Sequence, residues 1–341
     1  MNILVGNNHL RTTGGTENYT FTLALELKKQ GHDVEYFTFN KGEVSDLLEK
    51  NGIPFMSQRH YDLILANHKT VIEHLQSYGF IIQTCHGVVP YLEQPSSFAD
   101  AHVCVTDEIR RHLLKKGYDS TIILNGIDCE RFSPRKPLSG KLSSVLSICQ
   151  SEEMDEFIKD CCDTIGVDFH SCNKNTDNVW DIDHEINNAD LVVGIGRSLY
   201  DAMACGRCVI SYDKRSYVNA AIGDGYMTAD NFHDAVLFNC SGRGLRKTFT
   251  KEEFIAELQK YDPADGEWAR ATALESLNIS KAVEQYLAIY GSYLEKHPRG
   301  LALRCRKVYN HIPLAFKRTW RRIRRTFRKK KAGLYGNMTI A

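Results

Sequence analysis

The sequence has little that would place it across a membrane. In its 341 residues no apolar run approaches the ~20 residues that a membrane-spanning helix requires. Residues 1–6 lack the basic start and the long apolar stretch of a secretory signal, and they are typical of a first β-strand. We therefore expect a cytoplasmic protein.

A disulfide pattern is also missing. The chain has 11 cysteines, an odd number, and most of them lie in apolar runs, as Cys85, Cys104 and Cys149 do. This placement is typical of a reducing compartment. Cys205 and Cys208 form one CxxC pair without the second pair that a structural zinc site needs. We expect neither metal binding nor redox chemistry from them.

Acidic residues are absent from the C-terminal segment. From Lys296 onward there are 15 Lys or Arg and no Asp or Glu, so the rest of the chain has 28 basic and 42 acidic residues. Apolar side chains such as Trp320, Ile323 and Phe327 are interleaved with the cations. This pattern favours an anionic membrane surface as the partner of residues 298–331. A nucleic-acid arm is the less favoured alternative, and a solvated tail would leave the aromatic residues unexplained.

The chain is organised around residues 190–213. An apolar run, a turn with Gly194 and Gly196, and a helical periodicity that ends at Gly206 predict strand, turn and helix, followed by a second strand. We expect Ser198 to cap the helix. A parallel βαβ unit of this kind presents backbone N–H groups and the positive end of a helix to a phosphate. The same glycines would also suit a purely structural turn.

The third glycine of a dinucleotide fingerprint is missing, because Leu199 follows the turn. We therefore do not expect a nicotinamide enzyme. The sequence GRSLYDAMACG at 196–206 instead resembles the donor-site helix of the family 4 glycosyltransferases. In that family an acidic residue on this helix binds the ribose of a nucleotide sugar, and the resemblance assigns this role to Asp201.

The first half of the chain carries further points of resemblance. Gly14 and Gly15 stand where the family has a GGxE loop before its first helix. Paired glycines allow close backbone approach, so we predict contact with the donor phosphate or the acceptor across a cleft, with a flexible surface turn as the alternative. Asn125 begins the string NGID, which resembles the closing segment of the family's first domain. We place Asn125 at the donor site.

Two histidines directly follow predicted strands. His86 comes after the strand at 80–83, and His68 comes after an earlier one. The carboxyl ends of parallel strands face the crevice in which such sheets bind ligands. The family has a His-Gly pair at this point whose histidine contacts the donor sugar, which assigns that contact to His86. We expect His68 to be structural.

The resemblance covers most of residues 1–295 and is weakest at 150–188. It implies an α/β fold with two Rossmann-like domains and an interdomain cleft, the GT-B architecture, plus a basic C-terminal helical tail. We predict four segments: an acceptor-side domain at 1–137, a nucleotide-sugar-binding domain at 138–278, a helix crossing back to the first domain at 279–297, and a basic amphipathic tail at 298–341.

Some residues depart from the family pattern. Gln150 and the acidic residues after it stand where the family has an Arg and a Lys that hold the diphosphate. Val193 stands where a glutamate would contact the sugar hydroxyls. Asp181 and Asp183 form a DxD of the kind that holds a divalent cation in glycosyltransferases of another fold, but a predicted helix would separate the two carboxylates. We expect no metal site.

The resemblance implies a retaining, metal-independent glycosyltransferase that needs no cofactor. It would move a sugar from a nucleotide diphosphate donor to a glycan or lipid-linked acceptor. The turn from Gly194 would hold the leaving diphosphate through the N–H groups of Gly196 to Ser198 and through Arg197. The helix dipole contributes at most ~2 kcal/mol, so a cation is needed beside it. The alternative is a catalytically silent protein that only binds the nucleotide sugar. Together with the tail, this predicts polysaccharide biosynthesis at the inner face of the membrane.

Overall fold

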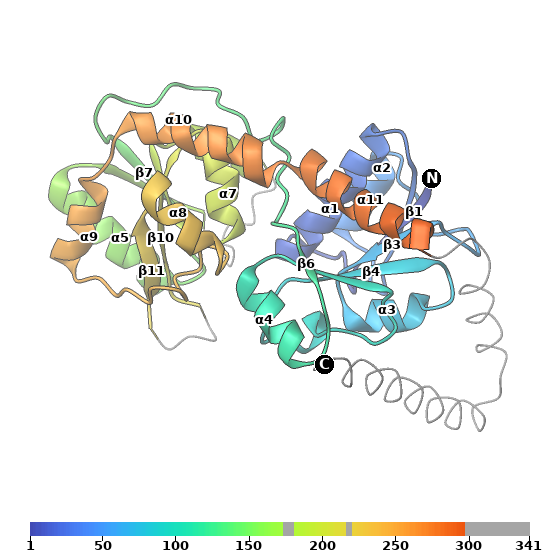
Figure 1. Ribbon diagram of the computed structural model, residues 1–341. Helices are drawn as coiled ribbons and strands as arrows, with labels where there is room; N and C mark the ends of the chain where they lie inside the picture. Colours follow the sequence, from blue (N-terminus) through green and yellow to red (C-terminus); the bar gives the residue numbers. More distant parts are fainter. Residues whose placement is uncertain (173–180, 216–219, 297–341) are drawn as a thin grey trace, which may run out of the picture.

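The computed structural model describes residues 1–172, 181–215 and 220–296, which form two α/β halves side by side (Figure 1). Each half is built on its own sheet. The first sheet has six parallel strands in the order β2-β1-β3-β4-β5-β6. The second has five strands in the order β11-β10-β9-β7-β8, of which only the edge strand β11 is antiparallel. This is the two-domain α/β architecture that the sequence predicts.

Strands and helices alternate along the first half. Its central strand β1 pairs with β2 on one side and β3 on the other, and its residues Ile3, Leu4 and Val5 are fully buried. An apolar run of this kind is expected where helices cover both faces of a parallel sheet. The elements are β1 (Asn2–Gly6), α1 (Gly15–Lys29), β2 (Asp33–Phe37), α2 (Glu43–Lys50), β3 (Leu63–Ala66), α3 (Lys69–Leu75), β4 (Phe80–Cys85), the 3₁₀ turn η1 (Tyr91–Glu93), β5 (Ala101–Cys104), α4 (Asp107–Lys115) and β6 (Thr121–Ile122).

The second half places the predicted central unit in the middle of its sheet. β9 pairs with β7 and β10, and α7 packs against both β9 and β10. The elements are β7 (Ser144–Ser147), α5 (Glu152–Ile165), β8 (Asp168–Ser171), α6 (Ile182–Asn188), β9 (Leu191–Gly194), α7 (Arg197–Ala204), β10 (Cys208–Asp213), β11 (Ile222–Tyr226), α8 (Ala229–Val236), α9 (Lys251–Leu258), α10 (Pro263–Thr272), the π-turn η2 (Ala273–Leu277) and α11 (Ile279–Lys296).

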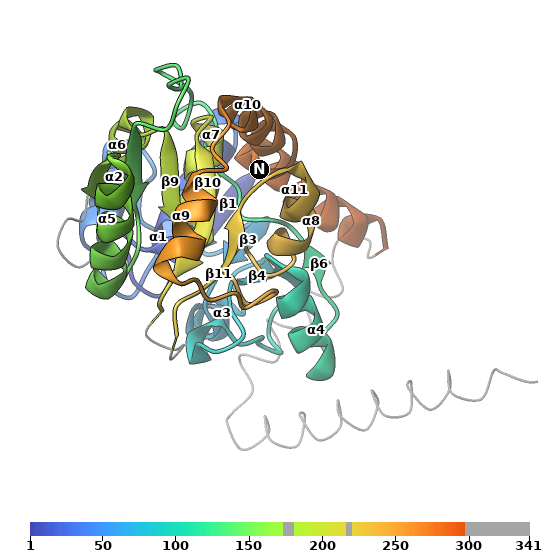
Figure 2. The same ribbon diagram turned by 90° about the vertical axis from the view of Figure 1, so that its left-hand side faces the viewer.

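The last described helix joins the two halves. α10 lies on the second half and α11 on the first (Figures 1 and 2). The hydroxyl of Tyr286 on α11 lies 2.8 Å from that of Tyr19 on α1 and 2.7 Å from Oγ1 of Thr84 at the end of β4. Val283 is fully buried in the first-half core. The chain therefore ties the two halves together on the side of α1.

None of the helices in the described part of the chain has the length and apolar character needed to cross a membrane. The predicted tail at 298–341 lies outside the described residues.

Candidate functional site between the two halves

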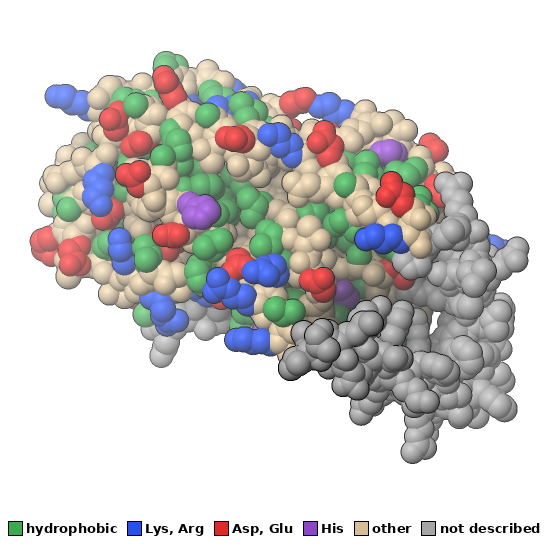
Figure 3. Space-filling view, viewed as in Figure 1, with side chains coloured by type: hydrophobic (Ala, Val, Ile, Leu, Met, Phe, Trp, Pro, Cys, Tyr) green, Lys and Arg blue, Asp and Glu red, His purple; other side chains and the backbone are tan. Residues whose placement is uncertain are grey.

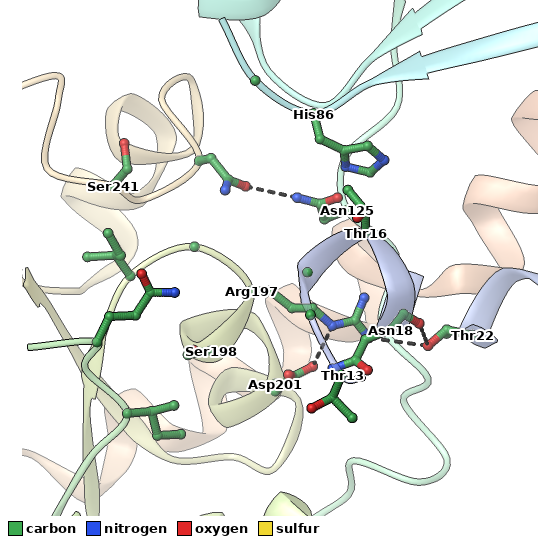
Figure 4. A pocket seen from close by; sticks show the side chains of 18 of the residues that line it. Thr13, Thr16, Asn18, Thr22, His86, Asn125, Arg197, Ser198, Asp201 and Ser241 are labelled. Carbon is green, nitrogen blue, oxygen red and sulfur yellow. Dashed lines mark hydrogen bonds and ion pairs between the residues drawn. The ribbon is translucent and has the colours of Figure 1, made fainter. Parts of the chain in front are cut away.

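A cavity of about 720 Å³ lies between the two halves, and side chains of both halves face it (Figure 4). Eight of the nine site residues predicted from the sequence line it. The exception is Gly194, which ends β9 and pairs with β10. The eight are Gly14, Gly15, His86, Asn125, Gly196, Arg197, Ser198 and Asp201.

Two helices begin at the cavity, one from each half. α1 begins at Gly15 with Gly14 as its N-cap, and α7 begins at Arg197 with Gly196 as its N-cap. Neither helix has a side-chain cap, so first-turn N–H groups remain available to a ligand. The positive ends of two helix dipoles therefore meet at one place, which favours an anion.

The start of α7 differs from the prediction in one respect. The N-cap is Gly196 and not Ser198, which already belongs to the first helical turn. Gly196 has φ 63°, and a Cβ there would lie 2.9 Å from Nδ2 of Asn239, so both conformation and space require glycine. The N–H of Gly196 donates to the carbonyl of Cys240 at 3.2 Å. The N–H groups of Arg197 and Ser198 are thus the ones left for an anion.

Arg197 reaches across the cavity from α7 to the first half. Its Nη2 donates to Oγ1 of Thr22 at 3.3 Å (Figure 4). Its Nη1 donates to the carbonyl of Gly126 at 3.4 Å. Its Nε lies 3.7 Å from Oδ1 of Asp201, one helical turn further along α7. The guanidinium is therefore held at the boundary between the halves by weak contacts.

Asp201 is a buried carboxyl with an unused acceptor. Its residue is 8% exposed, and Oδ1 accepts no hydrogen bond, since the contact with Arg197 is too long for one. Burial raises the pKa of Asp201 to about 6, against the lowering effect of Arg197 and Arg131. Buried polar atoms are nearly always satisfied, so this one indicates a ligand hydroxyl or another donor from the cavity.

His86 stands on the opposite wall as a neutral ring. Its Nε2 lies 3.2 Å from Oδ1 of Asn67, and its ring meets that of Tyr19 edge-on at 4.9 Å. Burial is the main cause that lowers the pKa of His86 to about 3, and the nearby His68 and Arg197 contribute to this lowering. His86 can thus offer hydrogen bonds to a sugar but no positive charge at neutral pH. His68, expected to be structural, is buried and hydrogen-bonds the N–H of Asn8.

Asn125 bonds across the cavity to a residue that the sequence did not reveal. Its Nδ2 donates to Oδ1 of Asn239 at 3.1 Å (Figure 4). Asn239 has φ 59° and the next residue, Cys240, has φ 45°. Left-handed conformations in non-glycine residues are uncommon and gather at functional sites. No sequence motif in this loop predicts the left-handed backbone at Asn239 and Cys240.

Three further arginines line the cavity and were also missed. Arg215 follows β10 and pairs with Asp213 at 2.9 Å, and Arg243 pairs with Glu108 of α4 at 2.6 Å. Arg131 is the third. They come from three separate segments, so no local motif joins them. Cations are therefore present even though Gln150 replaces the expected Arg-Lys pair.

Val193 and the DxD residues Asp181 and Asp183 are the other positions that differ from the family pattern, and none of them lines the cavity. Val193 is fully buried in the core of the second half and does not line the cavity. Asp183 is buried and pairs with Arg131 at 3.4 Å and Arg135 at 2.5 Å, whereas the side chain of Asp181 is 75% exposed. Within residues 1–172, 181–215 and 220–296, no three His, Cys, Asp or Glu side chains form a possible metal site.

The comparisons with known proteins agree with this architecture. No protein-family model matches the chain, and no curated protein matches its sequence. Among solved structures, HepE of Anabaena, in complex with UDP and glucose, is similar with a TM-score of 0.57 and 13% identity. The match covers 85% of this chain and 99% of HepE.

An α-glucosyltransferase in complex with UDP and a 13-mer DNA is also similar, with a TM-score of 0.52 and 10% identity over 85% of this chain and 99% of that one. The likenesses do not single out family 4, which stays a prediction. The chain therefore has the GT-B fold of these glycosyltransferases, with two Rossmann-like halves and a cavity between them.

Proposed function

We propose that the chain transfers a sugar from a nucleotide diphosphate donor to an acceptor hydroxyl. The observation that carries this proposal is the cavity between the halves, where two helix N-termini and the side chains of Arg131, Arg197, Arg215 and Arg243 meet. A diphosphate has the charge and the acceptor atoms that such a place selects. HepE and the α-glucosyltransferase, which share the fold, were both solved with UDP.

Different residues of the cavity bind the diphosphate, the ribose and the sugar of the donor. The diphosphate is held at the start of α7 by the N–H groups of Arg197 and Ser198 and by the arginines. The ribose hydroxyls donate to the unused Oδ1 of Asp201. The sugar then extends toward His86 on the first half, and the neutral ring contributes hydrogen bonds to it.

The reaction follows from the charge of the leaving group. When the bond between the anomeric carbon and the diphosphate breaks, negative charge develops on the phosphate, where fixed dipoles and guanidinium groups stabilise it. We propose that these groups do so without a divalent cation. We also propose that the acceptor attacks from the face that the diphosphate leaves, so that the anomeric configuration is retained.

The direct test is a panel of UDP-, GDP- and ADP-sugars incubated with the purified full chain and EDTA. The proposal expects slow release of the nucleoside diphosphate from one of them even without an acceptor, since water can replace the acceptor. A chain that binds a nucleotide sugar but never cleaves it, with any acceptor offered, is instead the silent binding protein.

For the acceptor we propose a glycan or a lipid-linked sugar at the inner face of a membrane. The support is the sequence of residues 298–331, with its cations and aromatic side chains. The face of the molecule in Figure 3 mixes acidic and basic side chains. The proposal of a membrane partner rests on the sequence of the tail.

A further inference from the structure

The first-half wall of the cavity carries a carboxyl group that the proposed donor site does not use. Glu93 ends the short turn η1 after β4 and lines the cavity with His86 and Gly87. A Cβ on residue 87 would lie too close to Oε2 of Glu93, so the carboxyl packs directly against the glycine of the His-Gly pair. The fold thus places Glu93 beside the histidine that we assign to the donor sugar.

Glu93 has no cation to neutralise it. Among the described residues none forms an ion pair with it, and the charged group that shifts its pKa is another carboxylate, Glu17, in the first turn of α1. Partial burial and Glu17 raise the pKa of Glu93 to about 7. Of the charged residues that line the cavity, Glu93 belongs to the first half, whereas Arg197, Arg215 and Arg243 belong to the second.

The rim beside Glu93 is apolar and exposed. Val89 is 69% exposed and Tyr91 is 71% exposed, and Val88, Val89 and Pro90 line the cavity mouth. Nζ of Lys69 lies 5.3 Å from the ring centre of Tyr91. An aromatic or aliphatic surface next to a carboxylate is a common arrangement for sugar rings, whose C–H faces pack on the apolar part while hydroxyls donate to the carboxylate.

We propose that this wall is the acceptor subsite, and that Glu93 selects a neutral polyhydroxyl sugar over an acidic one. Its carboxylate accepts hydrogen bonds from acceptor hydroxyls and repels a uronate or a phosphate at the same place. Glu93 is here a specificity-determining residue and no proton transfer is assigned to it. The inference rests on the proposed function, since the donor must fill the second-half wall first.

The test uses the full chain saturated with UDP and two probes, 4-nitrophenyl glucoside and 4-nitrophenyl glucuronide, whose binding is measured by ligand-observed NMR. At pH 8, where Glu93 is ionised, we expect the neutral glycoside to bind about tenfold more tightly, as one repulsive pair in a partly buried site implies. Glu93→Gln should reduce this preference to about twofold while UDP affinity stays unchanged. Glu284→Gln, the same change on the exposed face of α11, is the matched control.

The pH dependence of the preference for the glucoside distinguishes the effect of Glu93 from that of the neighbouring titratable groups. Several titratable or charged side chains lie around Glu93 and could also respond to pH. They are His86 after β4, Glu17 with its contact His9, Lys69 of α3, and His112 and Lys116 at the end of α4, both of which bond to Gln94 next to Glu93. The wild-type preference should fall at pH 6, because Glu93 is then mostly protonated, whereas Glu93→Gln should show the same ratio at both pH values.

The inference is overturned if the glucuronide binds as tightly as the glucoside at pH 8, if Glu93→Gln leaves their ratio unchanged, or if neither glycoside binds to a chain that binds UDP. A wild-type chain that fails to bind UDP would instead remove the proposed function itself.

Discussion

At the scale of single residues, the site combines residues that the sequence predicted with residues that no sequence motif indicated. Arg197 was predicted in the glycine-bearing turn and Asp201 on the helix that follows it, so their closeness in sequence was enough to bring them together. Asn239 and Arg243 reach the cavity from a loop whose left-handed backbone no motif signalled. Val193 stands where the family pattern has a glutamate, and it is buried in the core of the second half.

Arg197→Ala should weaken UDP binding about 10- to 100-fold, because a hydrogen bond to a charged group contributes about 1.5–3 kcal/mol. Calorimetry measures this loss. Arg111→Ala on the exposed side of α4 is the control and should bind UDP as the wild type does. Equal affinities for the Arg197 variant and the wild type would place the diphosphate elsewhere.

Asp201→Asn should stabilise the free protein while weakening its nucleotide binding. The pKa of Asp201 is raised in the folded state, so the protonated form is favoured there and the carboxylate costs stability as pH rises through about 6. At pH 7.5 the asparagine variant should gain about 2 kcal/mol in the free energy of unfolding, with a smaller gain at pH 5. Urea denaturation at both pH values measures this, and a loss of stability at pH 7.5 would show that Asp201 is a structural residue.

At the scale of elements, the sequence predicted the strands and helices of both halves well, because apolar runs and 3.6-residue periodicity reflect burial directly. Helix starts were predicted less well. Ser198 has the chemistry of a cap, but the left-handed Gly196 begins α7 two residues earlier. Which distant segments face the cavity depends on how the two sheets pack, and local patterns carry no information on that.

Tyr286→Phe should test how α11 holds the first half. The change removes the hydroxyl that contacts Tyr19 and Thr84 and leaves these buried groups with fewer partners. We expect a loss of about 1–2 kcal/mol in the free energy of unfolding. The same change at Tyr91, which is 71% exposed, should cost less than about 0.5 kcal/mol. Equal effects of the two changes would contradict the role of this contact.

At the scale of the whole molecule, charge divides the chain into an acidic body and a basic tail. If about half of the tail's cations reach an anionic surface, the attraction is of order 5 kcal/mol or more before ordering costs. A chain truncated after Glu295 should keep its fold and UDP binding but no longer sediment with anionic liposomes, and high salt should weaken the binding of the full chain. A full chain that ignores such liposomes but binds RNA or DNA would make the tail a nucleic-acid arm.

The central claim is that the cavity between the halves recognises a nucleoside diphosphate through helix N-termini and arginines, without a metal. Calorimetric titration of the full chain with UDP and then with UMP, both in EDTA, tests it most directly. We predict saturable binding of UDP with one site per chain, and at least about tenfold weaker binding of UMP, because it lacks the second phosphate. Equal affinity for UDP and UMP, or binding of UDP only after a divalent cation is added, would contradict this account.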